Sequence, residues 1–206
     1  MSTDEAIRLF LDELAASGAT PGGGSAAAVA GAMGAALVSM VCNLTIGKEK
    51  FSGVEAQMKE ILARSEALRA ELTQLMADDV AAFNAVMAAF RLPKATEADK
   101  RGRGEAVQAS LKQATLTPLA TARACAEVIE LCQSVVDMGN PNAISDAGAG
   151  AACAQAGLKA AALNVFINLP SLKDESFVLT RRAELEQILT RYDLADEIYE
   201  SVKGKL

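Results

Sequence analysis

The chain has 206 residues and a net charge of −6, and 51% of its residues are hydrophobic but only 4% are aromatic. A chain of this length can bury a sizeable core, so we expect a single domain over residues 1–206. The negative charge and the lack of a basic stripe argue against nucleic acid as a partner. No histidine occurs, which excludes the common zinc sites built on imidazole, and we expect no metal site.

The N-terminal segment "MSTDEAIRLF" is acidic and amphipathic. It lacks a basic region followed by an apolar one, so it does not resemble a secretory signal. The cysteines show no Cys-x-x-Cys spacing. We therefore expect a cytoplasmic protein with reduced thiols.

The pattern of apolar residues predicts an all-α protein. β-Branched and aromatic residues nowhere alternate with polar ones as they do in strands. Alanine is very frequent, and small side chains suit close packing between helices. We expect a bundle of long amphipathic helices around two Ala/Gly-rich helices.

In the first half of the chain we expect three helices. The first spans residues 3–16 and the second, small and apolar on all sides, spans residues 25–46. A third begins at a capping box formed by Ser52 and Glu55 and ends before "RLPK". Its apolar seam alternates steps of four and three, as in a coiled coil, and includes one acidic residue, Asp79, which we therefore expect to be at least partly buried.

In the second half, Thr96 and Asp99 open a fourth helix that ends near Gly139. We expect it to break or kink at Pro118 because proline removes a backbone donor. Ser145 or Asp146 is expected to cap the second Ala/Gly-rich helix, which ends near residue 168. A final amphipathic helix follows "LP".

The stretch "GATPGGGSAAAVAGAMGAALVSMVCNLTIGKEKF" has three possible explanations, since it carries no charge between Gly22 and Gly47. It is long enough to span a membrane, but its Ala/Gly content and its polar residues disfavour that, and we expect no membrane partner. A phosphate loop needs Ser or Thr after Gly-Lys, whereas Glu49 follows Lys48. A buried helix remains, with glycines that expose backbone N–H groups at its N-terminus.

Four blocks carry a resemblance: "TPGGGSAAA", "GAMGAALVSMVCNLTIGKEKF", "DDVAAFNAVMAAFRLPK" and "GNPNAISDAG". They are similar to the C-terminal domain of the formiminotransferase-cyclodeaminase family, in family order and over nearly the whole chain. The resemblance implies an all-helical homodimer that acts on a folate substrate without a bound cofactor.

Two activities occur in this family. The amino-acid sequences of the four blocks are most similar to those of its stand-alone methenyltetrahydrofolate cyclohydrolases. The resemblance therefore implies reversible hydrolysis of 5,10-methenyltetrahydrofolate to 10-formyltetrahydrofolate. The alternatives are a formimidoyltetrahydrofolate cyclodeaminase, which releases ammonia, and a non-catalytic folate-binding helical dimer.

Without histidine, proton transfer must fall to other groups. Lys48 is the first candidate, because a site at the end of an uncharged helix would lower its pKa; alternatively it only complements the helix dipole. Asp146 could balance a cationic substrate or bind the pterin, or serve only at a helix N-terminus. Asp79 could hold Lys48 in place for catalysis, or pair with Lys48 or an arginine for structure alone.

We expect Gly18–Phe51 to form one wall of the pocket, with glycines at its entrance and Lys48 at its other end. Arg91 and Lys94 could bind the glutamate tail of folate through charge-assisted hydrogen bonds. The expected substrate-binding residues are Gly22, Gly23, Gly24, Ser25, Cys42, Asn43, Arg91, Lys94 and Ser145. The cysteines other than Cys42 are expected to be small core residues.

Overall fold

The computed structural model describes residues 2–206, and no strand occurs in that range. The all-α prediction is confirmed. The α-helices are α1 (Thr3–Ala15), α2 (Gly23–Asn43), α3 (Glu55–Phe90), α4 (Glu97–Met138), α5 (Ile144–Asn168), α6 (Glu175–Leu189) and α7 (Arg191–Lys203). Short 3₁₀ turns occupy Glu49–Val54, Pro141–Ala143 and Leu169–Ser171.

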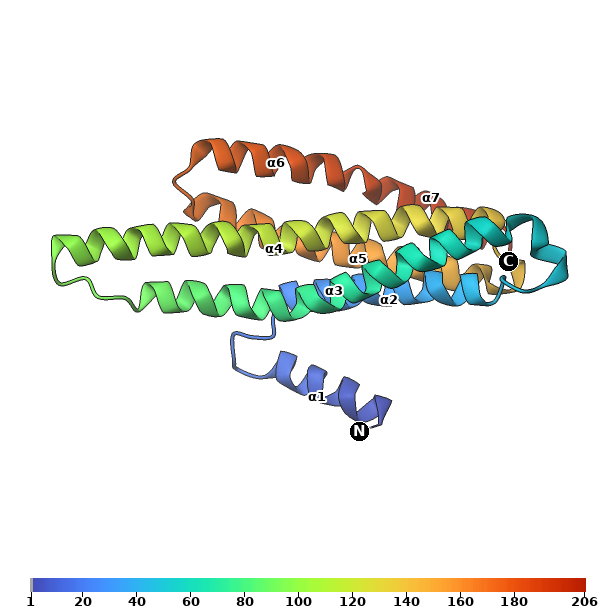
Figure 1. Cartoon of the computed structure of the whole chain (residues 1–206), viewed down its shortest axis with the longest axis horizontal. Coiled ribbons are helices and arrows are strands. Elements are labelled where there is room, and N and C mark those ends of the chain that lie inside the picture. The colour runs from blue at the N-terminus through green and yellow to red at the C-terminus, as the bar shows by residue number, and fades with distance from the viewer. Residues whose placement is uncertain (1) are drawn as a thin grey trace.

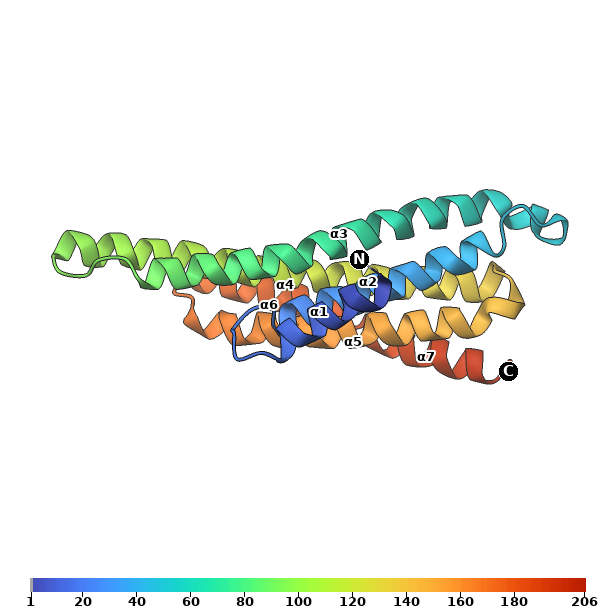
Figure 2. The same cartoon turned by 90° about the horizontal axis from the view of Figure 1, so that it is seen from below.

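The helices form an elongated bundle in which α3 and α4 are the longest members (Figure 1). The two Ala/Gly-rich helices, α2 and α5, pack against each other, α3 covers α2, and α4 contacts both. In Figure 2, α3 runs along the upper edge of the bundle, α2 and α5 lie below it, and α4 lies behind. The predicted arrangement of long helices around an Ala/Gly-rich pair is confirmed.

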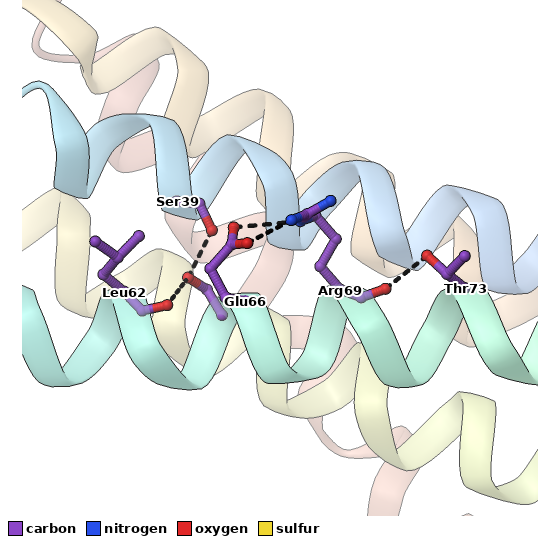
Figure 3. A network of polar contacts seen from close by, with 6 residues as sticks. Ser39, Leu62, Glu66, Arg69 and Thr73 are labelled. Carbon is purple, nitrogen blue, oxygen red and sulfur yellow. Dashed lines mark hydrogen bonds and ion pairs between the residues drawn. The ribbon is translucent and has the colours of Figure 1, made fainter.

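The apolar seam of α3 is buried as its spacing predicts, and it includes Met58, Leu68 and Leu72. Its one buried hydroxyl, Ser65, pairs with Ser39 of α2 at an Oγ–Oγ distance of 2.8 Å and donates to the Leu62 carbonyl at 3.0 Å (Figure 3). A buried polar group costs little when it is hydrogen-bonded in this way. The seam therefore tolerates Ser65 at little energetic cost.

Glycines allow the backbones of α2 and α5 to touch. A Cβ atom at Gly34 would lie 2.8 Å from the Gly150 carbonyl oxygen, and one at Gly157 would lie 2.8 Å from that of Ala27. Both distances are shorter than van der Waals contact. The Ala/Gly composition of these helices thus has a direct cause, because larger side chains at the contact would force the helices apart.

Of the break or kink predicted at Pro118, the break does not occur, because α4 runs through this residue. Proline leaves the carbonyl four residues earlier without its helical partner, which here is that of Ala114. The Nδ2 atom of Asn168 donates to this carbonyl at 2.8 Å. A side chain from α5 therefore replaces the lost hydrogen bond, which the sequence of α4 could not show.

Two predicted helix starts are wrong in detail. Ser52 lies within a 3₁₀ turn, and α3 begins after Val54 without a side-chain cap. Helix α5 begins at Ile144 after a turn in which Asn142 N–H donates to the Asn140 side chain at 3.1 Å. Ser145 and Asp146 therefore lie in the first turn of α5 and do not cap it.

The C-terminal region forms α6 and α7 where we expected one helix, and Thr190 separates them. Its hydroxyl donates to the Gln187 carbonyl at 2.7 Å, a local bond that competes with the helical pattern. Beyond Thr190, Ala195, Ile198 and Val202 of α7 are buried. Helix α7 packs against both α5 and α4.

By length and composition alone, Gly23–Asn43 and Pro141–Ser171 could each cross a membrane. Within the protein, 56% and 44% of these apolar windows are buried. The central helices of a folded bundle satisfy the same composition test, and here their apolar character serves the contact between α2 and α5.

The α2–α5 contact predicts opposite effects for two glycine substitutions. Gly157→Ala should lower the free energy of unfolding by about 1–2 kcal/mol, since overpacking costs more than the helix propensity gained. Gly102→Ala should raise it by up to ~1 kcal/mol, because that position in α4 has open space around it. Urea unfolding followed by circular dichroism measures both, and equal effects would contradict the close contact.

Candidate active site

A cavity of about 430 Å³ lies where the N-terminus of α2 meets α3, α4 and the C-terminal half of α5. Its walls are mainly apolar, with a carboxylate and two amides among them. The lining residues are Ala19, Thr20, Gly22, Gly23, Gly24, Asp79, Ala82, Phe83, Val86, Met87, Phe90, Leu111, Ala114, Pro118, Asn164, Ile167 and Asn168.

The carboxylate is that of Asp79, which is half-buried in the seam of α3. Its Oδ2 atom accepts a hydrogen bond of 3.0 Å from the Ser25 hydroxyl in the first turn of α2. Burial raises the pKa of Asp79, while hydrogen bonds from the Ser25 side chain and backbone lower it in part. The prediction that Asp79 is at least partly buried is confirmed.

Gly24 is required for this arrangement. A Cβ atom at Gly24 would lie 2.1 Å from Oδ1 of Asp79, so any other residue would displace the carboxylate. Helix α2 begins at a glycine N-cap, Gly22, that has no side-chain hydrogen bond. The first turn of α2 therefore presents its backbone N–H groups and the positive end of the helix dipole toward Asp79 and the cavity.

Two asparagines of α5, Asn164 and Asn168, line the cavity beside the glycines. Their Nδ2 atoms donate to the carbonyls of Ala160 and Ala114, each at 2.8 Å. Each side chain is thereby held in one orientation, and neither Oδ1 accepts a hydrogen bond from residues 2–206. These acceptors remain available to a ligand.

We did not predict the asparagines from the sequence. The available signal was their spacing of four residues, which places both on one face of an otherwise small and apolar helix. The aromatic wall formed by Phe83 and Phe90 was also missed; with Met87 between them, these side chains lie along α3 beyond Asp79 and remain partly exposed. A carboxylate, fixed amides and exposed rings together suit a flat, nitrogen-rich ligand.

Lys48 lies at the opposite end of the bundle. It follows the C-terminus of α2, whereas Asp79 contacts the N-terminus, and a helix of 21 residues is about 30 Å long. The prediction that Asp79 pairs with Lys48 or an arginine is therefore wrong within one chain: the partner is Ser25. Of Gly18–Phe51, only the part before Ser25 lines the cavity.

Other predicted site residues lie near Lys48. Asn140 links the loop before α5 to the segment after α2. Its backbone N–H donates to the Thr45 hydroxyl at 2.9 Å, and its side chain donates to the Leu44 carbonyl at 3.0 Å. Ser145 is exposed and Asp146 half-buried in the next helix. Neither the Asp146 nor the Lys48 side chain makes a hydrogen bond or ion pair with residues 2–206.

Cys42 does not line the cavity, which corrects the prediction. Its side chain is fully buried in the core, and burial raises the pKa of the thiol to about 11. The neighbouring Asn43 is exposed at the end of α2. Cys42 thus packs between helices, whereas Asn43 lies at the same end of the bundle as Lys48.

Arg91 and Lys94 are exposed in the loop between α3 and α4. They follow Phe90, which forms the outer part of the cavity wall. Neither forms an ion pair with residues 2–206. Both cations are therefore free to meet an anionic group that extends from the cavity, although neither lines it.

The described part of the chain, residues 2–206, holds no group of three or more cysteine, aspartate or glutamate side chains that could bind a metal ion. The titratable group inside the cavity is Asp79. Any proton transfer there involves this carboxyl group, the ligand or water.

Comparison with known proteins places the fold in an established family. The family model for formiminotransferase-cyclodeaminase matches residues 6–187. The chain therefore belongs to this family, and the resemblance seen in the sequence is confirmed.

Particular relatives refine this assignment. A methenyltetrahydrofolate cyclohydrolase from Methylorubrum extorquens is 54% identical over 207 residues, with 100% of both chains covered. The formimidoyltransferase-cyclodeaminase of Rattus norvegicus is 35% identical over 186 residues, which are 90% of this chain and 34% of that protein. A crystal structure of formiminotetrahydrofolate cyclodeaminase from Thermotoga maritima superposes with a TM-score of 0.82 at 30% identity, covering 100% of this chain and 96% of that one.

The raised pKa of Asp79 predicts a pH-dependent gain in stability for Asp79→Asn. Ionising this carboxyl costs more in the folded state than in the unfolded one, so wild-type stability falls as pH rises through the folded pKa. Asparagine stays neutral and can still accept from Ser25. Urea unfolding should show the variant to be more stable than wild type at pH 7, with the difference lost near ~pH 3. A less stable variant at pH 7 would contradict this.

Proposed function

We propose that this chain is a methenyltetrahydrofolate cyclohydrolase, which hydrolyses 5,10-methenyltetrahydrofolate reversibly to 10-formyltetrahydrofolate. The observation that carries the proposal is the Asp79 carboxyl in an apolar cavity, against the N-terminus of α2. The full-length relative from Methylorubrum extorquens supports this activity over the others in the family.

The cavity suits the shape of the substrate. Its volume of about 430 Å³ is in the usual range for small-molecule sites. We propose that the pterin lies beside Asn164 and Asn168, whose oxygens accept from its amino and ring N–H groups. The aromatic ring of the substrate would then lie along Phe83 and Phe90, and the glutamate tail would reach Arg91 and Lys94.

The reaction needs a base and a site that accepts positive charge. The methenyl carbon bridges N5 and N10 in a cationic amidinium. Water attacks this carbon, a C–O bond forms and one proton leaves. The C–N5 bond then breaks, N5 takes a proton and the hydroxyl group loses one, which gives the formyl group on N10. The net products are 10-formyltetrahydrofolate and one proton.

Asp79 is the group in the cavity that can take the proton from water. A bound cation lowers the pKa of a nearby carboxyl, which offsets the effect of burial and keeps Asp79 ionised while the substrate is present. Ser25 holds one carboxylate oxygen and leaves the other for water. The N–H groups of Gly23 and Gly24 would stabilise the negative charge that develops on the attacking oxygen.

We also propose roles for the residues at the other end of the bundle, and a location and an oligomeric state for the enzyme. Lys48 and Asp146 take part in catalysis, with Asn43 and Ser145 beside them, although they lie far from this cavity in one chain. The enzyme is a cytoplasmic homodimer of single-domain chains. It uses no metal, bound cofactor, nucleic acid or membrane.

The second candidate activity is that of a formimidoyltetrahydrofolate cyclodeaminase. The structural neighbour from Thermotoga maritima favours it, since that protein is described as a cyclodeaminase and shares the fold over the whole chain. Release of ammonia from formimino-tetrahydrofolate separates this activity from hydrolysis. A protein that binds folate and accelerates neither reaction would be a binding module.

The proposal predicts that Asp79→Asn abolishes most turnover. The loss should be about 100- to 10,000-fold in kcat, as for removal of a general base. Absorbance of methenyltetrahydrofolate in a non-nucleophilic buffer measures the rate.

Asp78→Asn is the matched control, because this neighbouring carboxylate accepts from Gln74 at 2.9 Å and does not line the cavity. Its rate should stay within a few-fold of wild type. If Asp79→Asn retains full activity, Asp79 is not the base. If wild type does not accelerate the decay of the substrate, the cyclohydrolase proposal fails.

Ser25→Ala should move the pH dependence of kcat/KM. The hydroxyl of Ser25 lowers the pKa of Asp79, so its removal raises that pKa further. Because the base must be ionised, the acid limb of the profile should shift to higher pH. Ser134→Ala, which loses only a bond to the Glu130 carbonyl in its own helix, should leave the limb in place. A shift to lower pH in Ser25→Ala would contradict the assigned role.

A further inference from the structure

A proline stands inside the longest helix, at the wall of the cavity. Pro118 is buried in α4 and lines the cavity. Proline has no N–H to donate, and its ring pushes against the carbonyl four residues earlier in the helix. Features that cost stability persist mainly where they serve a site. The position of Pro118 at the cavity therefore indicates a function for this residue.

The carbonyl that Pro118 deprives of its helical donor is that of Ala114, which also lines the cavity. Three buried threonine hydroxyls lie close to it in α4, but each donates to another carbonyl of the same helix. The pairs are Thr115 to Leu111 at 2.9 Å, Thr117 to Gln113 at 3.2 Å, and Thr121 to Thr117 at 3.3 Å. The side chain that donates to the Ala114 carbonyl is Asn168 of α5, through Nδ2 at 2.8 Å.

This contact fixes the direction of the Asn168 amide. A carbonyl oxygen accepts hydrogen bonds and cannot donate them, so the amide meets it with the NH₂ group and turns Oδ1 to the other side. Oδ1 accepts no hydrogen bond from residues 2–206. In that range the buried side-chain nitrogen or oxygen without a partner is Nε of Arg181. The Asn168 oxygen is therefore not enclosed by protein, and it is open to the cavity that this residue lines.

Asn164 presents a second oxygen to the cavity one helical turn earlier. Its amide is held by the Ala160 carbonyl of its own helix at 2.8 Å. Residues four apart on a helix lie about 6 Å from each other, so the two oxygens form a pair of neighbouring acceptors. Helix α5 orients Asn164 by itself, whereas the orientation of Asn168 depends on a carbonyl that the proline of α4 has freed.

We infer that Pro118 is a positioning residue for the substrate: it keeps the Asn168 oxygen turned toward the cavity, where that oxygen accepts a hydrogen bond from the pterin. The inference deepens the proposed function and rests on it for the identity of the ligand. It assigns to α4 a part in substrate recognition that no polar side chain of α4 performs in the cavity wall.

The substitution Pro118→Ala shows what the proline contributes. It supplies an N–H at position 118, which donates to the Ala114 carbonyl and draws it back into the helical pattern. The Asn168 amide then competes with that N–H for its acceptor and is held less firmly. An amide that turns its NH₂ group toward the N–H donors of the pterin leaves both groups without a partner, which weakens binding. The helix itself gains, because alanine suits a helix interior better than proline.

Hydrogen exchange of the Asn168 side chain tests the orienting contact without relying on activity. In protein with ¹⁵N-labelled asparagine, the NMR signal of this amide is identified by its loss in Asn168→Ala. Its hydrogens should exchange about 10-fold faster in Pro118→Ala than in wild type, as expected when one hydrogen bond is weakened. The matched control is Pro170→Ala, at an exposed proline outside the cavity wall, which should leave the rate unchanged. Equal rates in wild type and Pro118→Ala overturn the inference.

Steady-state kinetics test whether the oriented oxygen serves the substrate. A contact that is equally strong in the ground state and the transition state changes KM and leaves kcat in place. Pro118→Ala and Asn168→Ala should therefore each raise the KM for methenyltetrahydrofolate about 3- to 10-fold, the range for one neutral hydrogen bond. Their kcat values should stay within about twofold of wild type. A proline with a purely structural role would change stability and leave KM as it is.

The double variant Pro118→Ala/Asn168→Ala shows whether the two residues act through one contact. Its KM should match that of either single variant, because the second substitution removes an interaction that the first has already broken. Independent effects would multiply to about 10- to 100-fold and would overturn the inference. The urea midpoint gives a second reading: Asn168→Ala should lower it in wild type, where the Ala114 carbonyl loses its donor, and much less in Pro118→Ala.

The outcomes separate the inference from the proposed function. Wild type without turnover defeats the proposed function, and titration with 5-formyltetrahydrofolate, which carries the same reduced pterin ring, then decides the inference. A shift of the Asn168 amide signal in wild type that is much smaller in Pro118→Ala supports it. No shift in wild type, or equal shifts in both proteins, overturns it. In an active enzyme, an unchanged KM in Pro118→Ala does the same.

Discussion

The contact between the backbones of α2 and α5 is the constraint on which the rest of the structure depends. Gly34 and Gly157 leave no room for side chains where the helices meet. Because these positions cannot enlarge, α2 and α5 form a closely packed antiparallel pair (Figure 2). The longer helices α3 and α4 then pack against that pair, while Met33 of α2 and Leu163 of α5 remain exposed.

The same use of small residues builds the cavity. Gly24 lets the Asp79 carboxylate approach the first turn of α2, where Ser25 and the helix N-terminus offset the cost of a buried charge. Pro118 exposes a carbonyl in α4 that Asn168 satisfies, which orients an amide into the cavity wall. Asp79 and Asn168 are therefore held by contacts between two helices, whereas Asn164 is held by the Ala160 carbonyl of its own helix.

Particular residues show how far prediction from sequence extends. The seam of α3 and the unusual position of Asp79 follow from periodicity, because burial on a helix repeats every three or four residues. Asn164 and Asn168 were missed because the cavity that they line forms only on folding, as does the contact between Asn168 and the Ala114 carbonyl. The prediction that Ser52 caps α3 was wrong because the segment after α2 forms a 3₁₀ turn that includes Ser52.

The sequence by itself determined the all-helical class, the Ala/Gly-rich central pair, the family and most of the chemically capable residues. These properties depend on local spacing, side-chain size and motif identity. Only the tertiary structure decided which of those residues share a site. It separated Lys48 from Asp79, removed Cys42 from the site, and added the asparagines and the aromatic wall. The physical reason is that a straight helix fixes its two ends about 30 Å apart, a separation that residues adjacent to one motif in the sequence do not reveal.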